Sequence, residues 1–330
     1  MFLSVIIPTR NRAKYLAGAL ASITGQTYPQ ELFEVIVVDN GSTDNTKEVC
    51  ESFNDRIKNL RYFYEPTPGL HVGRHLGMRQ AKAEILVYAD DDIEAFPTWL
   101  EAIAESFQNP EVVLVGGKNL PKWEAEPPDW ILKMWEKDKN GNRILEYLSI
   151  IDLGDEKKFI NPFYVFGCNF SIKKKILQEF GGFHPDGMPE DLLRYRGDGE
   201  TYVCRSIYER GYISLYNPRA SIFHVISKNR LNDKYFYRRA FREGISYSFS
   251  FIRKRARESN STISSIYLPL FLKYLVLICK AFHIDKRKFF INISYLGGFF
   301  YHSSLFLTND SVKNWVMADT YIERKMTGIS

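Results

Sequence analysis

The chain has 330 residues, of which 45% are hydrophobic and 25% are charged, as in a globular protein of one large domain or two smaller ones. A net charge of +5 could favour an anionic membrane surface or anionic substrates, but it is too modest to indicate nucleic-acid binding by itself. Four scattered cysteines exclude a disulfide framework and a zinc site, and they predict reduced thiols in a cytosolic chain.

The first part of the chain alternates short apolar runs with helical patterns. We predict buried strands over residues 2–7 and 33–38, further strands over 60–64 and 85–89, and helices over 13–23, 43–53 and 72–83. Strands that alternate with helices in this way form βαβ units, so the fold class is α/β with a mostly parallel sheet.

The pattern loosens after residue 92. We predict helices over 97–107, 172–180 and 200–210, and strands over 112–117, 163–170 and 213–216. The stretch 121–158 is rich in Trp, Pro and charge, and we expect loops and short helices there. From residue 234 onward the chain is expected to be helical and aromatic.

Three consecutive aspartates, Asp90, Asp91 and Asp92, follow the apolar run 85–89. Adjacent carboxylates repel each other and resist desolvation, and a divalent cation would remove that penalty. Mg²⁺ or Mn²⁺ prefers oxygen ligands, usually one or two carboxylates together with substrate phosphates. Because open α/β sheets bind ligands beyond the carboxyl ends of their strands, the triplet predicts a metal–diphosphate site. A solvated acidic turn is the alternative.

Polar residues also follow the first two predicted strands, at the same expected edge of the sheet. Asp39 can accept hydrogen bonds from a base or a ribose, and Arg10 and Arg12 can offset the charge of a diphosphate. The simpler interpretations are an Asx-type turn over 39–44 and surface arginines that keep the protein soluble.

Five motifs, taken in order, resemble those of the family 2 glycosyltransferases, which have the GT-A fold. They lie at residues 4–12, 36–44, 69–77, 89–92 and 167–169. The resemblance covers residues 2–225. It implies an inverting transferase that moves a sugar from a nucleotide-sugar, usually a UDP-sugar, to a hydroxyl group of a saccharide or of a lipid-linked saccharide.

Carried over by position, the resemblance implies donor contacts along the sheet edge. Asp90 and Asp92 would hold the metal and the diphosphate, and Asp91 would lie beside the ribose. His75 stands where the family usually has Asn, which leaves its role open. The residues expected to bind the nucleotide-sugar are Pro8, Thr9, Arg10, Asp39, Arg74, Asp90 and Asp91.

The expected cofactor is Mg²⁺ or Mn²⁺, with Asp92, Asp90 and His224 as its ligands. His224 follows the late apolar run 220–223, and in several GT-A enzymes a histidine near this point joins the metal shell. Imidazole is acceptable to Mn²⁺, although a lone histidine is more often structural.

Transfer to a hydroxyl group also needs a base that accepts its proton. The segment 197–200 offers Asp198 and Glu200 just before a predicted helix. The family usually has a Glu-Asp pair here, with the aspartate as base. An ungapped alignment anchored at Val203 and Gly211 places Glu200 at the position of that aspartate. Asp198 remains the competitor. Acids also favour a helix N-terminus without any catalytic role.

The last third of the chain carries two apolar segments, 263–282 and 289–309, which are borderline for a membrane-spanning helix. Basic clusters at 253–257 and 285–288 suit an anionic cytoplasmic leaflet. We expect peripheral or monotopic attachment at the cytoplasmic face of the membrane, which would suit a lipid-linked acceptor. A helical packing layer of a soluble protein is the alternative.

These predictions together describe a GT-A domain over 1–228, with a nucleotide-sugar half at 1–92 and an acceptor half at 93–228. A helical region follows at 229–330. The expected role is in cell-surface polysaccharide or glycolipid synthesis. One rival is a sugar-phosphate nucleotidyltransferase, which would need a glycine-rich loop after the first strand. The other is an inactive binding or scaffold protein with the same fold.

Overall fold

The computed structural model describes residues 1–258, 276 and 285–323, and its contacts divide the chain into two compact units. Within the described residues, we call them the sheet unit (residues 1–184, 200–228 and 320–323) and the helical unit (residues 185–199, 229–258, 276 and 285–319). The segment 185–199 therefore belongs to the helical unit, and the segment 320–323 returns to the sheet unit. The domain boundary expected at residue 228 stays a prediction.

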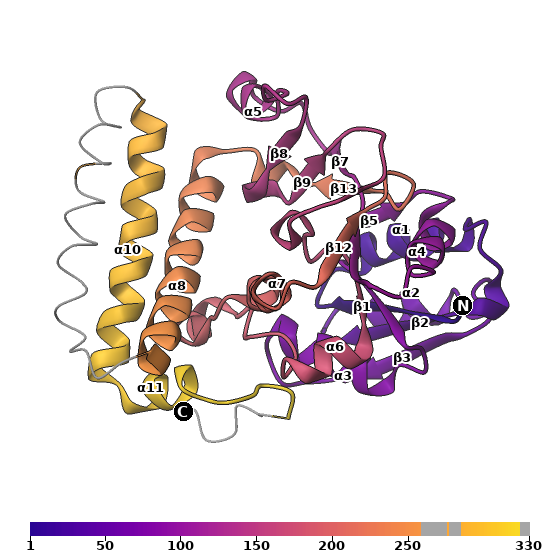
Figure 1. Ribbon diagram of the computed structural model, residues 1–330, viewed down its shortest axis with the longest axis horizontal. Coiled ribbons are helices and arrows are strands. Elements are labelled where there is room, and N and C mark those ends of the chain that lie inside the picture. The colour runs from indigo at the N-terminus through magenta and orange to yellow at the C-terminus, as the bar shows by residue number, and fades with distance from the viewer. Residues whose placement is uncertain (259–275, 277–284, 324–330) are drawn as a thin grey trace. The chain divides into compact units, whose positions relative to one another are not determined.

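The sheet unit is built on an eight-stranded sheet with the order β10-β12-β6-β11-β4-β1-β2-β3 (Figure 1). Its parallel part consists of β1 (Leu3–Thr9), β2 (Phe33–Asp39), β3 (Leu60–Tyr64) and β4 (Ile85–Ala89). The helices α1 (Ala13–Thr24), α2 (Thr46–Glu51) and α3 (Leu70–Gln80) connect these strands. The βαβ alternation predicted from the sequence is confirmed, and the ends of β1, β2 and β4 share one edge.

The other half of this sheet is mixed. β11 (Asn169–Lys173) runs antiparallel to β4 and β6 (Val112–Gly116), β12 (Ile213–Tyr216) runs parallel to β6, and β10 (Lys158–Phe159) closes the edge. The strand predicted over 163–170 is wrong in its bounds. Asn161 accepts a hydrogen bond from the Phe163 amide at 3.1 Å and Pro162 follows it, which favours the 3₁₀ turn at Pro162–Tyr164.

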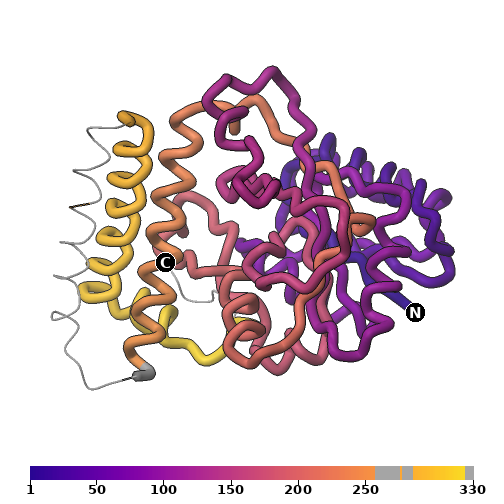
Figure 2. Tube along the Cα trace, turned by 45° about the horizontal axis from the view of Figure 1, so that its top comes forward, coloured from indigo at the N-terminus to yellow at the C-terminus, as the bar shows by residue number. Residues whose placement is uncertain are grey.

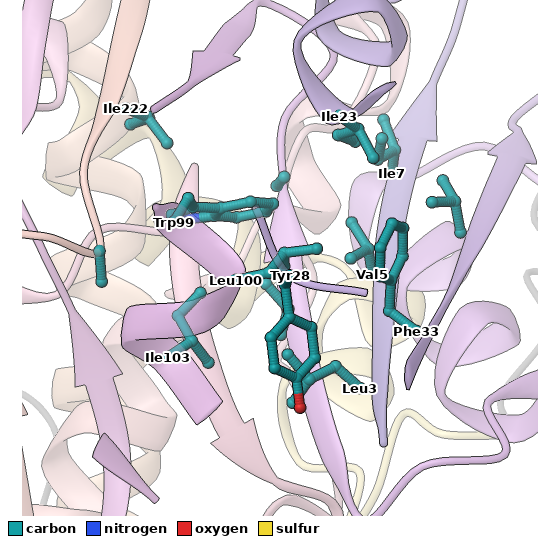
Figure 3. Packing of buried hydrophobic residues seen from close by; sticks show 14 of the residues in the cluster. Leu3, Val5, Ile7, Ile23, Tyr28, Phe33, Trp99, Leu100, Ile103 and Ile222 are labelled. Atoms are coloured by element: carbon teal, nitrogen blue, oxygen red, sulfur yellow. The ribbon is translucent and has the colours of Figure 1, made fainter. Parts of the chain in front are cut away.

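Both faces of β1, β2 and β4 are buried, whereas β3, at the edge of the sheet, is only partly buried. Leu3, Val5 and Ile7 of β1 point to one face, where they pack with α1 and with α4 (Trp99–Ser106), as Figure 3 shows. Ile6 points to the other face, toward α3, α6 (Lys174–Glu179) and α7 (Gly199–Glu209). This two-sided burial explains why the strands are continuous apolar runs.

A second sheet, which the sequence did not predict, has five strands in the order β5-β13-β7-β9-β8. Several of its strands are only three residues long, too short to show alternation, and two of them lie in the stretch expected to form loops. The elements are β5 (Ile93–Ala95), β7 (Asn119–Trp123), α5 (Asp129–Met134), β8 (Arg143–Leu145), β9 (Ile150–Asp152) and β13 (Ile222–Ile226).

The helical unit pairs α8 (Asp233–Glu258) with α10 (Lys286–Thr308), which lie side by side and run in the same direction (Figures 1 and 2). α11 (Asp310–Val316) follows. Two glycines permit the close contact of α8 and α10. A Cβ atom on Gly244 would lie 1.9 Å from the Tyr295 carbonyl oxygen, and one on Gly298 would lie 1.8 Å from that of Phe241.

The helical character expected after residue 234 is confirmed for the residues that the structure describes. The apolar segment 289–309 falls largely in α10, whereas the segment 263–282 lies outside the described residues except for Val276. Within residues 1–258, 276 and 285–323, no helix has the length and hydropathy needed to cross a bilayer. Within the basic cluster 253–257, Arg253 is buried and donates to the Ala318 carbonyl at 2.7 Å.

The helix contact gives a stability prediction with a matched control. Gly298→Ala should lower the free energy of unfolding by about 1–3 kcal/mol, because the new methyl group meets backbone that cannot move aside. Gly297→Ala should be neutral or stabilising, since its Cβ would meet the Phe241 ring at 3.6 Å and alanine favours the helix. Thermal or urea unfolding of both variants checks this. Equal stabilities would show that the two helices do not pack as described.

Candidate active site

The aspartate triplet lies at the end of β4, next to the end of β1. Asp91 and Asp92 are buried, and the side chain of Asp90 is 33% exposed. Thr9, the last residue of β1, donates its hydroxyl hydrogen to Asp91 Oδ2 at 2.7 Å. The parallel pairing of β1 with β4 therefore brings the first and fourth motifs together, as predicted from the sequence.

Arg12 is the counter-charge of the two buried aspartates. Its Nε donates to Asp91 Oδ1 at 2.6 Å, and its Nη2 donates to Asp92 Oδ2 at 2.5 Å. The Tyr15 ring lies against the guanidinium, 4.5 Å from Cζ. Burial raises the pKa of Asp91 to about 7, and Arg12 opposes this effect while Asp92 reinforces it. Arg12 is thus part of the site rather than a solubilising surface residue.

His224 reaches the triplet through the second sheet. β13 pairs with β5, so that His224 lies opposite Ile93, and the Val225 amide donates to the Asp92 carbonyl at 2.8 Å. His224 Nδ1 lies 2.9 Å from the Leu148 carbonyl oxygen, which can only accept. Nδ1 therefore carries a hydrogen. The other nitrogen, Nε2, faces Asp92 Oδ1 at 3.3 Å.

Asp92 Oδ1 and His224 Nε2 are two atoms that could hold a divalent cation if a substrate supplied the other ligands. A carbonyl bonded to Nδ1 fixes the tautomer in which Nε2 is the metal-binding nitrogen. Asp90 points instead toward Arg74, with 3.6 Å between its Oδ1 and Nη2. Among the described residues, no group of three or more His, Cys, Asp or Glu side chains could hold a metal ion alone. A diphosphate would have to supply further oxygen ligands, as is usual for Mg²⁺.

Asp39 ends β2 and holds the turn that follows it. Its Oδ1 accepts from the Ser42 amide at 2.7 Å, and its Oδ2 accepts from the Tyr62 hydroxyl at 2.7 Å. The Asx-type turn, given above as the simpler interpretation of this segment, is therefore present, at the same edge as the triplet. Pro8 is partnered with Val38 inside the sheet, and Arg10 is exposed just beyond β1.

Arg74 on α3 joins Asp90 to Glu200. The Arg74 side chain is 2% exposed, and its Nη1 lies 3.3 Å from Glu200 Oε2, at the start of α7. Its Nη2 donates to the Gly167 carbonyl at 3.3 Å. The Glu200 side chain is 27% exposed, so that a carboxylate open to solvent lies above a buried guanidinium.

The two acids proposed as base have different surroundings. Glu200 belongs to the sheet unit and contacts Arg74, whereas Asp198 belongs to the helical unit. Asp198 is 6% exposed, and its Oδ2 accepts a hydrogen bond from the Ser250 hydroxyl on α8. The neighbouring Arg196 forms an ion pair with Asp186 at 2.6 Å. Glu200 is therefore the more accessible carboxylate.

His75 has a structural role that the sequence left open. Its Nε2 accepts from the Phe183 amide at 2.9 Å, and its Nδ1 donates to the Tyr321 carbonyl at 3.1 Å. Burial lowers the pKa of His75 well below its usual value, which keeps the ring neutral. His75 thus fastens the returning segment 320–323 to α3, next to Arg74. No local signal could reveal a partner 246 residues away.

Asn169, in the last of the five motifs (residues 167–169), is fully hydrogen-bonded inside the protein. Its Oδ1 accepts from Trp99 Nε1 at 2.9 Å, and its Nδ2 donates to Asn119 Oδ1 at 3.1 Å and to the Ala220 carbonyl at 3.0 Å. These bonds connect the two sheets of the sheet unit. Asn169 therefore has a structural role: it holds together the two sheets that carry the site.

Comparisons with known proteins agree with this arrangement. Residues 4–181 match the family model for Glycosyl transferase family 2. Glycosyltransferase AglE of Haloferax volcanii is 39% identical over 117 residues, which are 35% of this chain and 38% of AglE. The glucosyl-dolichyl phosphate glucuronosyltransferase of the same organism is 26% identical over 258 residues, covering 74% of this chain and 76% of that protein.

Two solved structures share the fold. The mannosyltransferase PcManGT from Pyrobaculum calidifontis, in complex with GDP-Man and Mn²⁺, has a TM-score of 0.54 at 19% identity and covers 97% of this chain and 84% of its own. GalNAc-T7 with UDP, GalNAc and Mn²⁺ has a TM-score of 0.53 at 18% identity, over 68% of this chain and 43% of its own. At these identities the likeness concerns the fold alone.

Proposed function

Because the chain belongs to glycosyl transferase family 2, we propose that it moves a sugar from a UDP-sugar to a hydroxyl group, with inversion at the anomeric carbon. The observation that carries this proposal is the convergence of acidic and basic side chains at one sheet edge. A chain of hydrogen bonds and ion pairs links them: Thr9 to Asp91, Asp91 and Asp92 to Arg12, and Asp92 to His224.

We assign the donor to this edge. Asp39, with Pro8 and Thr9, would contact the nucleoside, and Asp91 would lie beside the ribose. Arg10 is exposed at the end of β1, where it can reach a diphosphate. Asp90 precedes Asp91 in the sequence and is partly exposed, and we place it next to the diphosphate. The common edge of β1, β2 and β4 supports this assignment.

Asp92 and His224 would hold Mg²⁺ or Mn²⁺. Such a cation neutralises the charge that develops on a departing diphosphate. Support comes from the 3.3 Å between Asp92 Oδ1 and His224 Nε2, and from the tautomer that Leu148 imposes on the ring. Arg12 occupies the other Asp92 oxygen, so that Asp92 would present Oδ1 to the metal.

Glu200 is the proposed base, and Asp198 is the competitor. In this reaction the acceptor oxygen forms a bond to the anomeric carbon while its proton passes to the carboxylate. The bond from that carbon to the diphosphate breaks on the opposite side, so configuration inverts. Accessibility favours Glu200, because Asp198 is buried and bonded to Ser250.

For the acceptor we propose a saccharide or lipid-linked saccharide used in cell-surface polysaccharide or glycolipid synthesis, reached from the cytoplasmic face of the membrane. Lys254, Arg255, Lys286 and Lys288 are exposed on the helical unit and could contact anionic lipid. Sedimentation of the full-length chain with phosphatidylglycerol vesicles, but not with phosphatidylcholine vesicles, would support peripheral attachment. Recovery in the supernatant with both would count against it.

A screen of nucleotide-sugars tests the function. The purified chain is incubated with Mn²⁺ and with UDP-glucose, UDP-glucuronate, UDP-N-acetylglucosamine or GDP-mannose, and free nucleoside diphosphate is measured. We expect UDP release from one of the UDP-sugars, dependent on metal. If no donor or acceptor extract gives free nucleoside diphosphate, the scaffold alternative is favoured. If pyrophosphate forms from UTP and a sugar phosphate, a nucleotidyltransferase is favoured.

A further inference from the structure

The Arg74 guanidinium is buried below the carboxylates of Asp90 and Glu200, which are themselves partly exposed to solvent. Only 2% of its side chain is exposed, against 33% for Asp90 and 27% for Glu200. The guanidinium spans both, with Nη2 directed at Asp90 and Nη1 at Glu200, and its Cζ lies 5.1 Å from the Phe183 ring centroid. The buried Arg74 guanidinium therefore contacts the two carboxylates directly. A ligand that arrives from solvent would contact Asp90 and Glu200 before it could reach Arg74.

We propose that Arg74 is the positioning residue of the base: it holds the Glu200 carboxylate in place and couples it to Asp90 on the donor side. This inference rests on the proposed function, in which Glu200 accepts the acceptor's proton. The sequence alone placed Arg74 among the donor contacts, and its burial gives it this different role.

The distances from Arg74 to Asp90 and to Glu200 are those expected when two carboxylates share one guanidinium. Charge-assisted bonds between nitrogen and a carboxylate are typically about 2.7–2.9 Å long. The 3.3 Å to Glu200 and 3.6 Å to Asp90 are longer, because one planar fork serves both carboxylates and the Gly167 carbonyl. A change at Asp90, such as the arrival of a diphosphate with its metal, therefore alters how strongly Arg74 holds Glu200.

Gly167 makes this approach possible. A Cβ atom at this position would lie 2.5 Å from Arg74 Nη2 and 2.9 Å from Glu200 Oε1. A side chain here would push the guanidinium and the carboxylate out of their places. The absence of a side chain at Gly167 leaves room for the ends of both side chains.

A double-mutant cycle tests the inference. Hydrolysis of the UDP-sugar found in the screen is measured for the wild type, Arg74→Met, Glu200→Gln and the double variant. We expect Arg74→Met to lower kcat about 10²-fold through misplacement of the base, and the double variant to match Glu200→Gln within about threefold, because the two residues act as a unit. Arg74→Lys should recover part of the loss, since it keeps the charge but not the fork.

Binding separates this role from a donor contact. The Kd of UDP with Mn²⁺ should change by less than about threefold in Arg74→Met, because the arginine does not touch the nucleotide. A tenfold or larger rise in that Kd, or losses that multiply in the double variant, would overturn the inference while leaving Glu200 as base. Full turnover in Glu200→Gln would instead show that the proposed base, and with it the premise, is wrong.

Gly167→Ala provides a test that keeps every charge in place. We expect kcat to fall about tenfold or more, with the Kd of UDP–Mn²⁺ retained, because the methyl group separates Arg74 from Glu200. Gly25→Ala is the matched control, since its Cβ would meet only the Ser22 carbonyl oxygen at an ordinary 3.6 Å. Wild-type kcat in a folded Gly167→Ala protein, judged by its melting temperature, would contradict the proposal.

Discussion

Asp92→Asn should abolish the metal-dependent release of UDP. The substitution keeps the volume of the side chain but removes the anionic oxygen that faces His224 Nε2 at 3.3 Å. A metal ion that neutralises a leaving diphosphate contributes several kcal/mol, so we expect turnover to fall by about 10³-fold. The measurement is initial-rate UDP release across a Mn²⁺ titration, accompanied by Mn²⁺ binding to the protein with UDP.

The control for Asp92→Asn is the same change at Asp55, an exposed aspartate outside the site. Asp55→Asn should leave both Mn²⁺ dependence and turnover unaltered. His224→Gln should weaken Mn²⁺ binding less than Asp92→Asn, because it removes a neutral ligand and not a charge. If Asp92→Asn folds and retains wild-type turnover and Mn²⁺ dependence, the assignment of the metal to this pair is wrong.

Glu200→Gln should lower transfer by about 10²–10⁴-fold, the usual contribution of a positioned base. Asp198→Asn should retain transfer within about tenfold, because Asp198 is buried and its Oδ2 is bonded to Ser250. Its effect should fall on the stability of the helical unit. Initial rates with donor and acceptor, and melting temperatures of both variants, separate these outcomes.

The reverse pattern, with transfer intact in Glu200→Gln and lost in a folded Asp198→Asn protein, would assign the base to Asp198. Ser250→Ala helps to distinguish the two roles of Asp198. If the Ser250–Asp198 hydrogen bond only stabilises the helical unit, Ser250→Ala should lower the melting temperature and leave kcat unchanged. A large loss of kcat there would also argue against Glu200.

The sequence predicted the parts of the site that depend on local pattern. The sequence alone shows apolar strands that end close to Thr9 and Asp39 and just before the aspartate triplet. Parallel pairing of these strands brings their ends to one edge of the sheet. The contact of Thr9 with Asp91 follows directly from that pairing. The likeness of five ordered motifs to one family then indicated the chemistry.

The remaining parts depend on pairings between distant segments. The family resemblance named His224 as a metal ligand, but the pairing of the three-residue strand β5 with β13 that brings it to Asp92 has no signal in the sequence, because a run that short shows no alternation. Arg12 has two interpretations in sequence, and only its contacts with Asp91 and Asp92 decide between them. The neutral His75 and the returning segment at Tyr321 have no local signature at all.

A crystal of the full-length chain grown with UDP and Mn²⁺ tests the central claim most directly. The claim is that Asp92, at the end of β4, and His224, on β13, hold a cation and the diphosphate it binds at the edge of the sheet where Asp39 also lies. The account predicts an anomalous Mn²⁺ peak bound by Asp92 and His224, with diphosphate oxygens completing its coordination and the nucleoside near Asp39. Mn²⁺ and UDP bound elsewhere, with no metal beside Asp92 and His224, would contradict the account.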